Sequence, residues 1–278
     1  MRSKQIEAEI EKIYKSIWKK VFSKNRIDAA MKGKTNIIRS SIVNIETSEQ
    51  FDEFAQKFAK KLAQKGLSRQ RGLWRKYFKA AKDSGIIALP NTYSDFERKM
   101  MKNAITHNFK MIKSIPSKIL EVYKHQYTKT LIKQVAEGKL GRNSFFRQLS
   151  SHGHKNAKLI ARTETAKLQT SITQNRATEL GSTAYIWQSS NDIRTRQSHR
   201  AMNGVIVFWR DDEEEKPLLD NMYGHAGEFP NCRCTPLPIF DKTDLNVAMY
   251  KVYNYKTHEI ETKRKQEVIK LLENGGFE

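Results

Sequence analysis

The sequence has few cysteines and no long apolar run. Its 278 residues include two cysteines, Cys232 and Cys234, and the single residue between them makes a disulfide within the pair a strained link. A secreted disulfide scaffold is therefore excluded, and synthesis in a reducing cytoplasm is favoured. No apolar stretch approaches the roughly 18 residues of a membrane helix, and charges interrupt the apolar residues after Met1. We therefore expect neither a membrane span nor a signal peptide.

Acidic residues are scarce in the first half of the chain. Lys and Arg number 51 against 30 Asp and Glu, which gives a net charge of +21. Residues 1–150 hold 33 of the basic and 13 of the acidic residues, whereas residues 151–278 hold 18 and 17. This asymmetry indicates an acidic partner for the first half, and nucleic acid is the obvious candidate. A solvated lysine-rich surface or an acidic protein partner would explain the same charge.

The first half has the apolar periodicity of helices. One stripe comprises Ile6, Ile10, Ile13, Tyr14, Ile17, Trp18 and Val21, and another comprises Phe51, Phe54, Ala55, Phe58 and Leu62. Thr47 or Ser48 is the expected cap of the second helix and Gly66 its expected end. A break at 89–91 and a further helix over 116–135 are also predicted. These stripes are typical of packing surfaces, so we expect a helical core here.

The second half predicts a mixed structure. We expect a long helix over 154–180, strands over 183–188 and 205–209, an irregular segment over 223–238 and a final helix over 259–272. The buried face of the long helix should comprise Ala161, Thr165, Leu168 and Ile172. The predicted fold class is α+β, with a mainly helical N-terminal half and a C-terminal module of a long helix, a small β-sheet and an irregular Cys-x-Cys segment.

Four good metal ligands lie in the second half, namely His199, His225, Cys232 and Cys234. Cys and His are the usual ligands of structural zinc, which is mostly four-coordinate and tetrahedral. Asp192 is an alternative to His225 as the fourth ligand. The spacing is not that of a standard zinc finger. Reduced thiols beside surface histidines are the alternative interpretation, and an open site with bound water would instead allow hydrolysis.

Five charged residues form a second candidate cluster: Arg162, Glu164, Asp192, Arg194 and Arg196. If the first strand folds back along the long helix, these charges meet and lock the loop by mutual pairing. The same arginines would alternatively serve as anion clamps. No Gly-rich phosphate loop, Gly-x-Ser-x-Gly elbow or His-Glu-x-x-His pair occurs. Enzymatic activity is not supported, although a metal-dependent nuclease or hydrolase remains the alternative.

The order of motifs in the second half resembles the phage Mu F-like minor head protein family, also called phage head morphogenesis proteins. The motifs are Ala161-Arg-Thr-Glu-Thr-Ala166, Trp187, Asp192-x-Arg194-x-Arg196-x-x-His199, Gly204 and Asn231-Cys-Arg-Cys234. The resemblance covers roughly residues 110–240. The residues that fall on the family's motif are Arg162, Glu164, Asp192, Arg194, His199, Cys232 and Cys234. Three regions follow: a basic helical region over 1–110, the Mu F-like module over 111–240 and a helical extension over 241–278.

The resemblance implies a non-enzymatic minor head protein of a tailed phage or prophage. Such a protein is made in the host bacterial cytoplasm and associates with the portal protein, and with scaffold or major capsid protein, during capsid assembly. It would lie in the virion, inside the capsid near the portal vertex. There the basic residues of 1–150 would contact packaged double-stranded DNA without sequence preference, in DNA packaging or ejection. A general DNA-binding protein is a further alternative.

Overall fold

The structure is a computed structural model that describes residues 4–31, 36–68, 70–83, 85, 91–124, 130–131, 133–135, 137–241 and 244–277. The predicted break at 89–90 and residues 125–129 of the predicted helix over 116–135 lie outside these ranges. The chain forms two compact units that alternate along the sequence. The first holds Ser3–Lys65 and Ile105–Thr165, and the second holds Gly66–Ala104 and Ala166–Glu278. The predicted region boundaries at 110 and 240 stay predictions.

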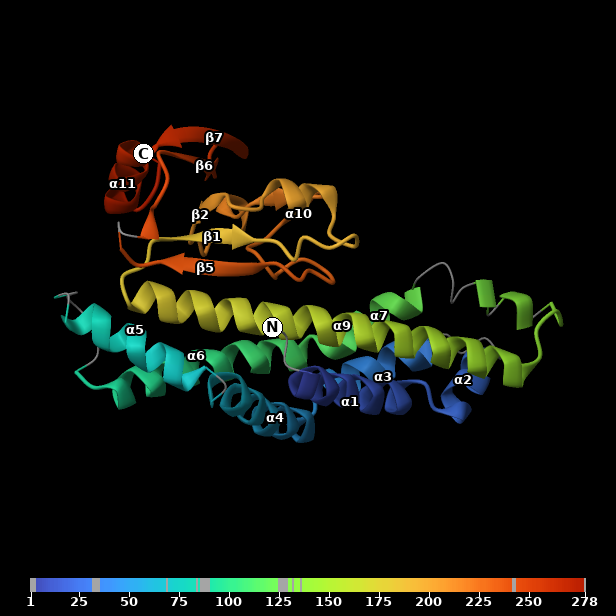
Figure 1. The fold of residues 1–278 in the computed structure, drawn as a ribbon. Coiled ribbons are helices and arrows are strands. Elements are labelled where there is room, and N and C mark those ends of the chain that lie inside the picture. The colour runs from blue at the N-terminus through green and yellow to red at the C-terminus, as the bar shows by residue number, and fades with distance from the viewer. Residues whose placement is uncertain are drawn as a thin grey trace. The chain divides into compact units, whose positions relative to one another are not determined.

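Helices dominate the first half, as Figure 1 shows. They are α1 (Lys4–Val21), α2 (Lys24–Met31), α3 (Asn36–Glu46), α4 (Glu49–Ser68), α5 (Arg71–Asp83), α6 (Tyr93–Lys113), α7 (Ile115–Lys124) and α9 (Arg142–Glu179). The second half adds the short helix α10 (Gln197–Ala201), the 3-10 turn η1 (Glu213–Glu215) and α11 (Lys265–Asn274). Among the described helices, none combines the length and the apolar character needed to cross a bilayer.

The core of the first unit is built from the predicted stripes. All seven stripe residues of α1 are buried. In α4 the buried apolar residues are Phe51, Ala55, Ala59, Leu62, Ala63 and Leu67, whereas the predicted Phe54 and Phe58 are half-buried. Ser48 caps this helix, because its hydroxyl accepts a hydrogen bond from the Phe51 amide at 3.3 Å. The periodicity therefore predicted the positions of these helices. It did not predict which side of the α4 stripe is fully buried, because that depends on how the helix packs.

Two expected helix boundaries, the end of one helix at Gly66 and the start of the long helix at His154, lie inside helices. Gly66 does not end α4, which continues to Ser68. A Cβ at Gly66 would lie 2.9 Å from Ile172 Cδ1, so the glycine permits close packing within the second unit. The long helix α9 begins at Arg142 rather than at 154 and passes through Gly153. A Cβ at Gly153 would lie 2.4 Å from the ring of Trp18.

A five-stranded mixed sheet organises the second unit. Its strands run in the order β5 (Thr235–Ile239), β1 (Ala184–Gln188), β2 (Ile206–Phe208), β6 (Met249–Asn254) and β7 (Glu259–Arg264). The pair β2–β6 is parallel and the other pairs are antiparallel. A separate hairpin joins β3 (Leu218–Leu219) to β4 (Met222–Tyr223). The predicted α+β class and the strands at 183–188 and 205–209 are confirmed.

Two segments differ from the prediction. The segment over 235–239 is strand β5 rather than irregular, with Pro236 and Pro238 opposite Trp187 and Tyr185. β5 is an edge strand, where a missing backbone N–H is tolerated. The predicted helix over 259–272 is strand β7 followed by α11, whose C-cap is Gly275 with φ 74°. Pairing of β7 with β6 overrides the helical pattern of residues 259–264.

Candidate metal centre

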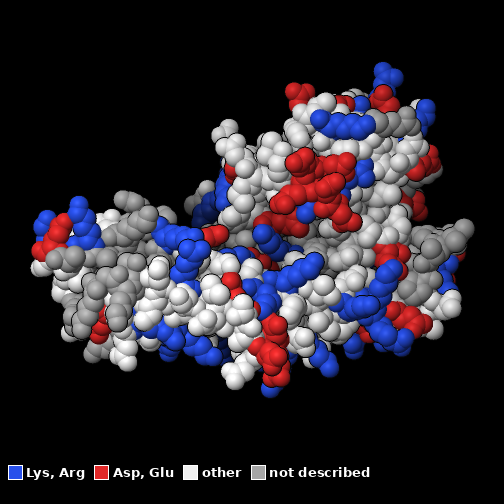
Figure 2. Space-filling view, turned by 180° about the vertical axis from the view of Figure 1, so that it is seen from behind, with Lys and Arg blue, Asp and Glu red and all other residues white. Residues whose placement is uncertain are grey.

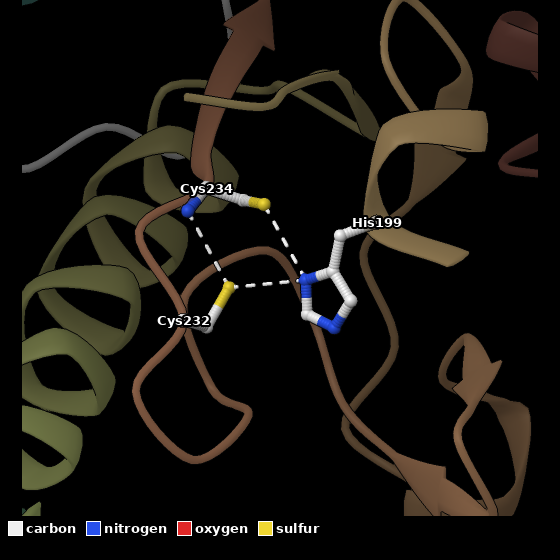
Figure 3. A group of neighbouring side chains, drawn as sticks. All are labelled: His199, Cys232 and Cys234. Atoms are coloured by element: carbon white, nitrogen blue, oxygen red, sulfur yellow. Dashed lines mark hydrogen bonds between the residues drawn. The ribbon is translucent and has the colours of Figure 1, made fainter. Parts of the chain in front are cut away.

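Three of the predicted ligands meet in the second unit, as Figure 3 shows. His199 lies on α10, and Cys232 and Cys234 lie on the turn that leads into β5. His199 Nδ1 is 3.4 Å from Cys232 Sγ and 3.5 Å from Cys234 Sγ. All three side chains are buried, with exposed fractions of 3%, 5% and 7%. The three ligand atoms lie within 4.8 Å of one another, so they can share one ion.

The turn before Cys232 explains why the thiols converge. Pro230 and Asn231 are its central residues, and the Cys232 amide donates to the Phe229 carbonyl at 2.9 Å. Asn231 has a φ of 56°, a left-handed conformation that Asn tolerates better than most residues. Proline followed by a left-handed residue is the pattern of a type II turn. The Cys234 amide then donates to Cys232 Sγ at 3.4 Å, which orients the first sulfur.

Rings and a carboxylate orient His199. Trp187 and Phe229 meet the imidazole edge to face, with ring centroids 5.8 and 4.9 Å away. On the side away from the sulfurs, His199 Nε2 lies 3.3 Å from Arg196 Nη1 and 3.8 Å from Asp220 Oδ2. Asp220 and Asn221 form the two-residue turn between β3 and β4, with φ values of 52° and 60°. A metal-binding histidine commonly donates its second ring N–H to such a carboxylate.

The surroundings shift the pKa values of the two thiols in opposite directions. The pKa of Cys232 is lowered to about 4, because Cys234 donates to its sulfur and His199 lies beside it. The pKa of Cys234 is raised, because its thiol is hydrogen-bonded to Cys232 and is also buried. One proton is thus shared between the sulfurs, and ionising both requires a positive charge between them. A bound divalent cation supplies that charge.

The geometry fits zinc. Zn–S and Zn–N bonds in a tetrahedral site place a sulfur and a nitrogen ligand roughly 3.5 Å apart, and the two observed nitrogen–sulfur distances are 3.4 and 3.5 Å. The Trp187 indole N–H is buried without a hydrogen-bond acceptor among the described residues and lies beside Cys234. A thiolate at Cys234 is a natural acceptor for it. The described residues thus offer three protein ligands.

Neither predicted fourth ligand joins this group. His225 is fully buried, and its Nδ1 lies 3.1 Å from the Tyr185 hydroxyl while its Nε2 lies 2.9 Å from the Arg210 carbonyl oxygen. Burial lowers the pKa of His225, which favours the neutral ring. The Ala226 amide donates to the same Tyr185 hydroxyl. His225 therefore anchors the segment before the Cys-x-Cys turn and is not placed as a ligand.

Asp192 forms a clamp instead of binding metal. Arg233, the residue between the two cysteines, donates to both carboxylate oxygens of Asp192, at 2.5 Å for Nη2 and Oδ1. The Arg194 amide also donates to Asp192 Oδ1, at 3.0 Å. Hydrogen bonding from Arg233 lowers the pKa of Asp192 to about 2. Arg196 adds a second tie by donating to the Pro230 carbonyl at 2.6 Å.

The predicted five-charge cluster is divided between the units. Asp192 and Arg194 form an ion pair at 3.8 Å in the second unit. Glu164 belongs to the first unit, where Lys118 Nζ donates to it at 2.7 Å. Arg162 is an exposed residue of α9 in that unit. Neither unit by itself contains all five residues, and the strongest partner of Asp192 is Arg233, which was not in the predicted cluster.

Three contributors to the site were missed by sequence reasoning, although each has a signal. Arg233 lies inside the Asn-Cys-Arg-Cys motif. Asp220 precedes Asn221 between two apolar pairs, which is the composition of a two-residue hairpin turn. Phe229 precedes the Pro-Asn turn. None of these signals indicates by itself that the side chain reaches His199 or Asp192.

Part of the chain that contains this centre is similar to known proteins. Residues 125–237 match the family model described as Phage Mu protein F like protein. An uncharacterized protein of Haemophilus influenzae (strain ATCC 51907 / DSM 11121 / KW20 / Rd) is 32% identical over 145 residues, which cover 51% of this chain and 30% of that protein. The alignment thus spans less than a third of the relative's length. No solved structure matches the chain. The matched residues include His199, Cys232 and Cys234, and the match supports the resemblance that the sequence motifs predicted.

Proposed function

We propose that this chain is a non-enzymatic minor head protein of a tailed phage or prophage, which associates with the portal vertex during capsid assembly. The observation that carries the proposal is the family match over residues 125–237. The motif residues His199, Cys232 and Cys234 converge within this matched segment on one buried centre. A location in the virion, inside the capsid near the portal, follows from the same proposal, as does contact with scaffold or major capsid protein.

The metal centre is proposed to hold a structural Zn²⁺. His199 Nδ1 and the sulfurs of Cys232 and Cys234 would bind the ion, with one position left for water or another ligand. Two thiolates neutralise the ion and weaken it as a Lewis acid, and the burial of all three ligands restricts access of a substrate. Binding energy at such a site is folding energy for the turn that leads into β5.

The competing function is a metal-dependent nuclease or hydrolase, because three protein ligands and one open position also describe catalytic zinc sites. Zinc content and a nuclease assay on the purified chain distinguish the two. One zinc per chain without cleavage supports the structural role. Metal-dependent cleavage of DNA that His199→Ala abolishes would support the enzyme.

Contact with packaged DNA through the basic first half is a further part of the proposal. Figure 2 shows basic side chains scattered over the view, with acidic side chains in one larger patch and in several smaller groups. Deleting residues 1–110 is a poor test, because residues 66–104 belong to the second unit and their loss would expose its core. Charge-removing substitutions in the full chain are the better test, since exposed side chains can change without unfolding either unit.

Co-expression with the portal protein of the same phage or prophage tests the main proposal. We expect the two proteins to co-purify through a size-exclusion step, with one zinc per copy of this chain by elemental analysis. A chain that binds DNA tightly but never associates with portal would instead be a general DNA-binding protein. A chain that is indifferent to both would refute the proposal.

A further inference from the structure

A groove of about 460 Å³ runs along the first half of α9 in the first unit. The residues that line it are Arg147, Ser150, Ser151, His154, Lys155 and Lys158. They recur at three- and four-residue steps, so they lie on one face of the helix. The eleven steps from the first to the last span roughly 17 Å at a rise of 1.5 Å per residue. The groove is therefore an elongated polar track rather than a compact pocket.

The opposite face of α9 holds this track in place. Phe145, Leu149, Ala157 and Ala161 are all buried in the first unit. Gly153 faces the ring of Trp18, which lets the helix approach α1 closely. All six groove residues are exposed. The helix is thus fixed by its apolar side, and its basic side faces solvent.

The charges of the groove are unneutralised within the described part of the chain. The lining has three permanent cations, one histidine and two hydroxyls, and it includes no acidic residue. None of the six side chains has a hydrogen bond or ion pair with a described residue. Other lysines of the same unit are paired: Lys65 contacts Glu9 and Lys118 contacts Glu164. The groove therefore concentrates cations that the fold itself does not use.

We propose that this face of α9 binds the phosphate backbone of double-stranded DNA. The inference rests on the proposed function and names the surface that makes the DNA contact. Lys and Arg neutralise phosphates, and serine hydroxyls are common donors to phosphate oxygens. Phosphates of one DNA strand follow one another at about 3.4 Å along the axis, so the track faces about five of them.

The composition favours DNA over an acidic protein. Protein interfaces are anchored by buried aromatic and aliphatic side chains and are depleted of lysine. Among the described residues that line the groove there are two lysines and no aromatic or aliphatic side chain. The described lining also includes no Asn or Gln side chain with which to read a base edge, so binding is expected to be independent of sequence.

The test variant is the full chain with Arg147→Gln, Lys155→Gln and Lys158→Gln. Its affinity for a fluorescent DNA duplex of about 30 base pairs and random sequence is measured by anisotropy over a series of salt concentrations. Each lost phosphate contact lowers the slope of log K against log salt by about 0.9, so we expect a decrease of up to about 2.7. At 0.1 M salt we expect at least a tenfold weaker complex. Circular dichroism and the thermal midpoint confirm that the variant folds.

The matched control removes the same charge elsewhere on the first unit, through Arg39→Gln, Lys57→Gln and Lys60→Gln. These three residues are also exposed. We expect the control to keep most of the affinity and slope of the unmodified chain. Equal losses in both triple variants would overturn the groove as the site and leave the proposed DNA contact standing. No binding by the unmodified chain would overturn both. Loss of portal co-purification with DNA binding retained would instead make the groove a protein-docking surface.

Discussion

Arg233 and Asp192 form a two-point ion pair that ties the Cys-x-Cys turn to the loop before His199. Arg233 lies between the two cysteines, and Asp192 lies seven residues before the histidine. The pair therefore joins the two segments that supply the metal ligands. Since a planar guanidinium binds a carboxylate through two parallel hydrogen bonds, it also sets the orientation of the turn.

The clamp predicts a pH-dependent effect of Asp192→Asn. The folded-state pKa of Asp192, about 2, lies below its ordinary value of 3.8. The stabilisation is therefore fully present above about pH 4 and is lost as the pH falls towards 2. We expect the urea midpoint of the chelator-treated variant to be lower than that of the unmodified chain at pH 6, and the difference to shrink at pH 3. A difference that is the same at both pH values would contradict the role of the charged pair.

The carboxylate behind His199 predicts an effect on metal affinity. Asp220→Asn keeps a residue that tolerates the left-handed turn but removes the charge near His199 Nε2. Loss of such a partner typically weakens metal binding about 10–100-fold, and we expect a decrease in zinc affinity of about this size for Asp220→Asn. Competition with a chromophoric zinc chelator measures the change. Asp212→Asn, which removes an exposed carboxylate from the same unit, is the control and should leave zinc affinity unchanged.

The close approach of Gly153 to Trp18 predicts a destabilising glycine substitution. A Cβ at this position would meet the buried ring at 2.4 Å, so Gly153→Ala should cost about 1–3 kcal/mol of the free energy of unfolding. Gly72→Ala in α5 is the matched control, because nothing lies within 4 Å of its Cβ position. That control should be neutral or gain up to about 1 kcal/mol from helix propensity. Urea denaturation measures both, and Trp18→Leu should relieve the clash.

The buried Arg176 predicts a substitution that the fold tolerates. Its side chain is fully buried in the second unit, and desolvation lowers the pKa of the guanidinium to about 10. It stacks 5.4 Å from the Trp74 ring centroid and donates to the Leu67 carbonyl at 3.4 Å, while Nε and Nη1 lack partners among the described residues. Arg176→Met should be neutral or stabilise the chain by about 1–4 kcal/mol. A large loss of stability in thermal denaturation would show that the charge is needed.

Much of the secondary structure could be predicted from the sequence, because periodicity, capping and β-propensity depend only on residues that are close together in the chain. The α1 stripe, the Ser48 cap and the strands around Tyr185 and Val207 follow from periodicity, capping and β-propensity. The strand over residues 259–264 could not be predicted in this way, because it depends on hydrogen bonds to β6. Gly66 was expected to end its helix, and the long helix was expected to begin at His154, after Gly153. A sequence does not show that Ile172 or Trp18 occupies the space beside each glycine.

The candidate site divides in the same way. The types of its ligands, the rigidity of the Pro230–Asn231 turn and the family resemblance are properties of the sequence, because each depends on residue identity and short spacing. Which histidine joins the cysteines was decided by tertiary structure. His199 is carried to the sulfurs by the loop between β1 and β2, whereas His225 is held by Tyr185 and Arg210. Long-range packing makes that choice, because both histidines have the same chemistry and only their surroundings differ.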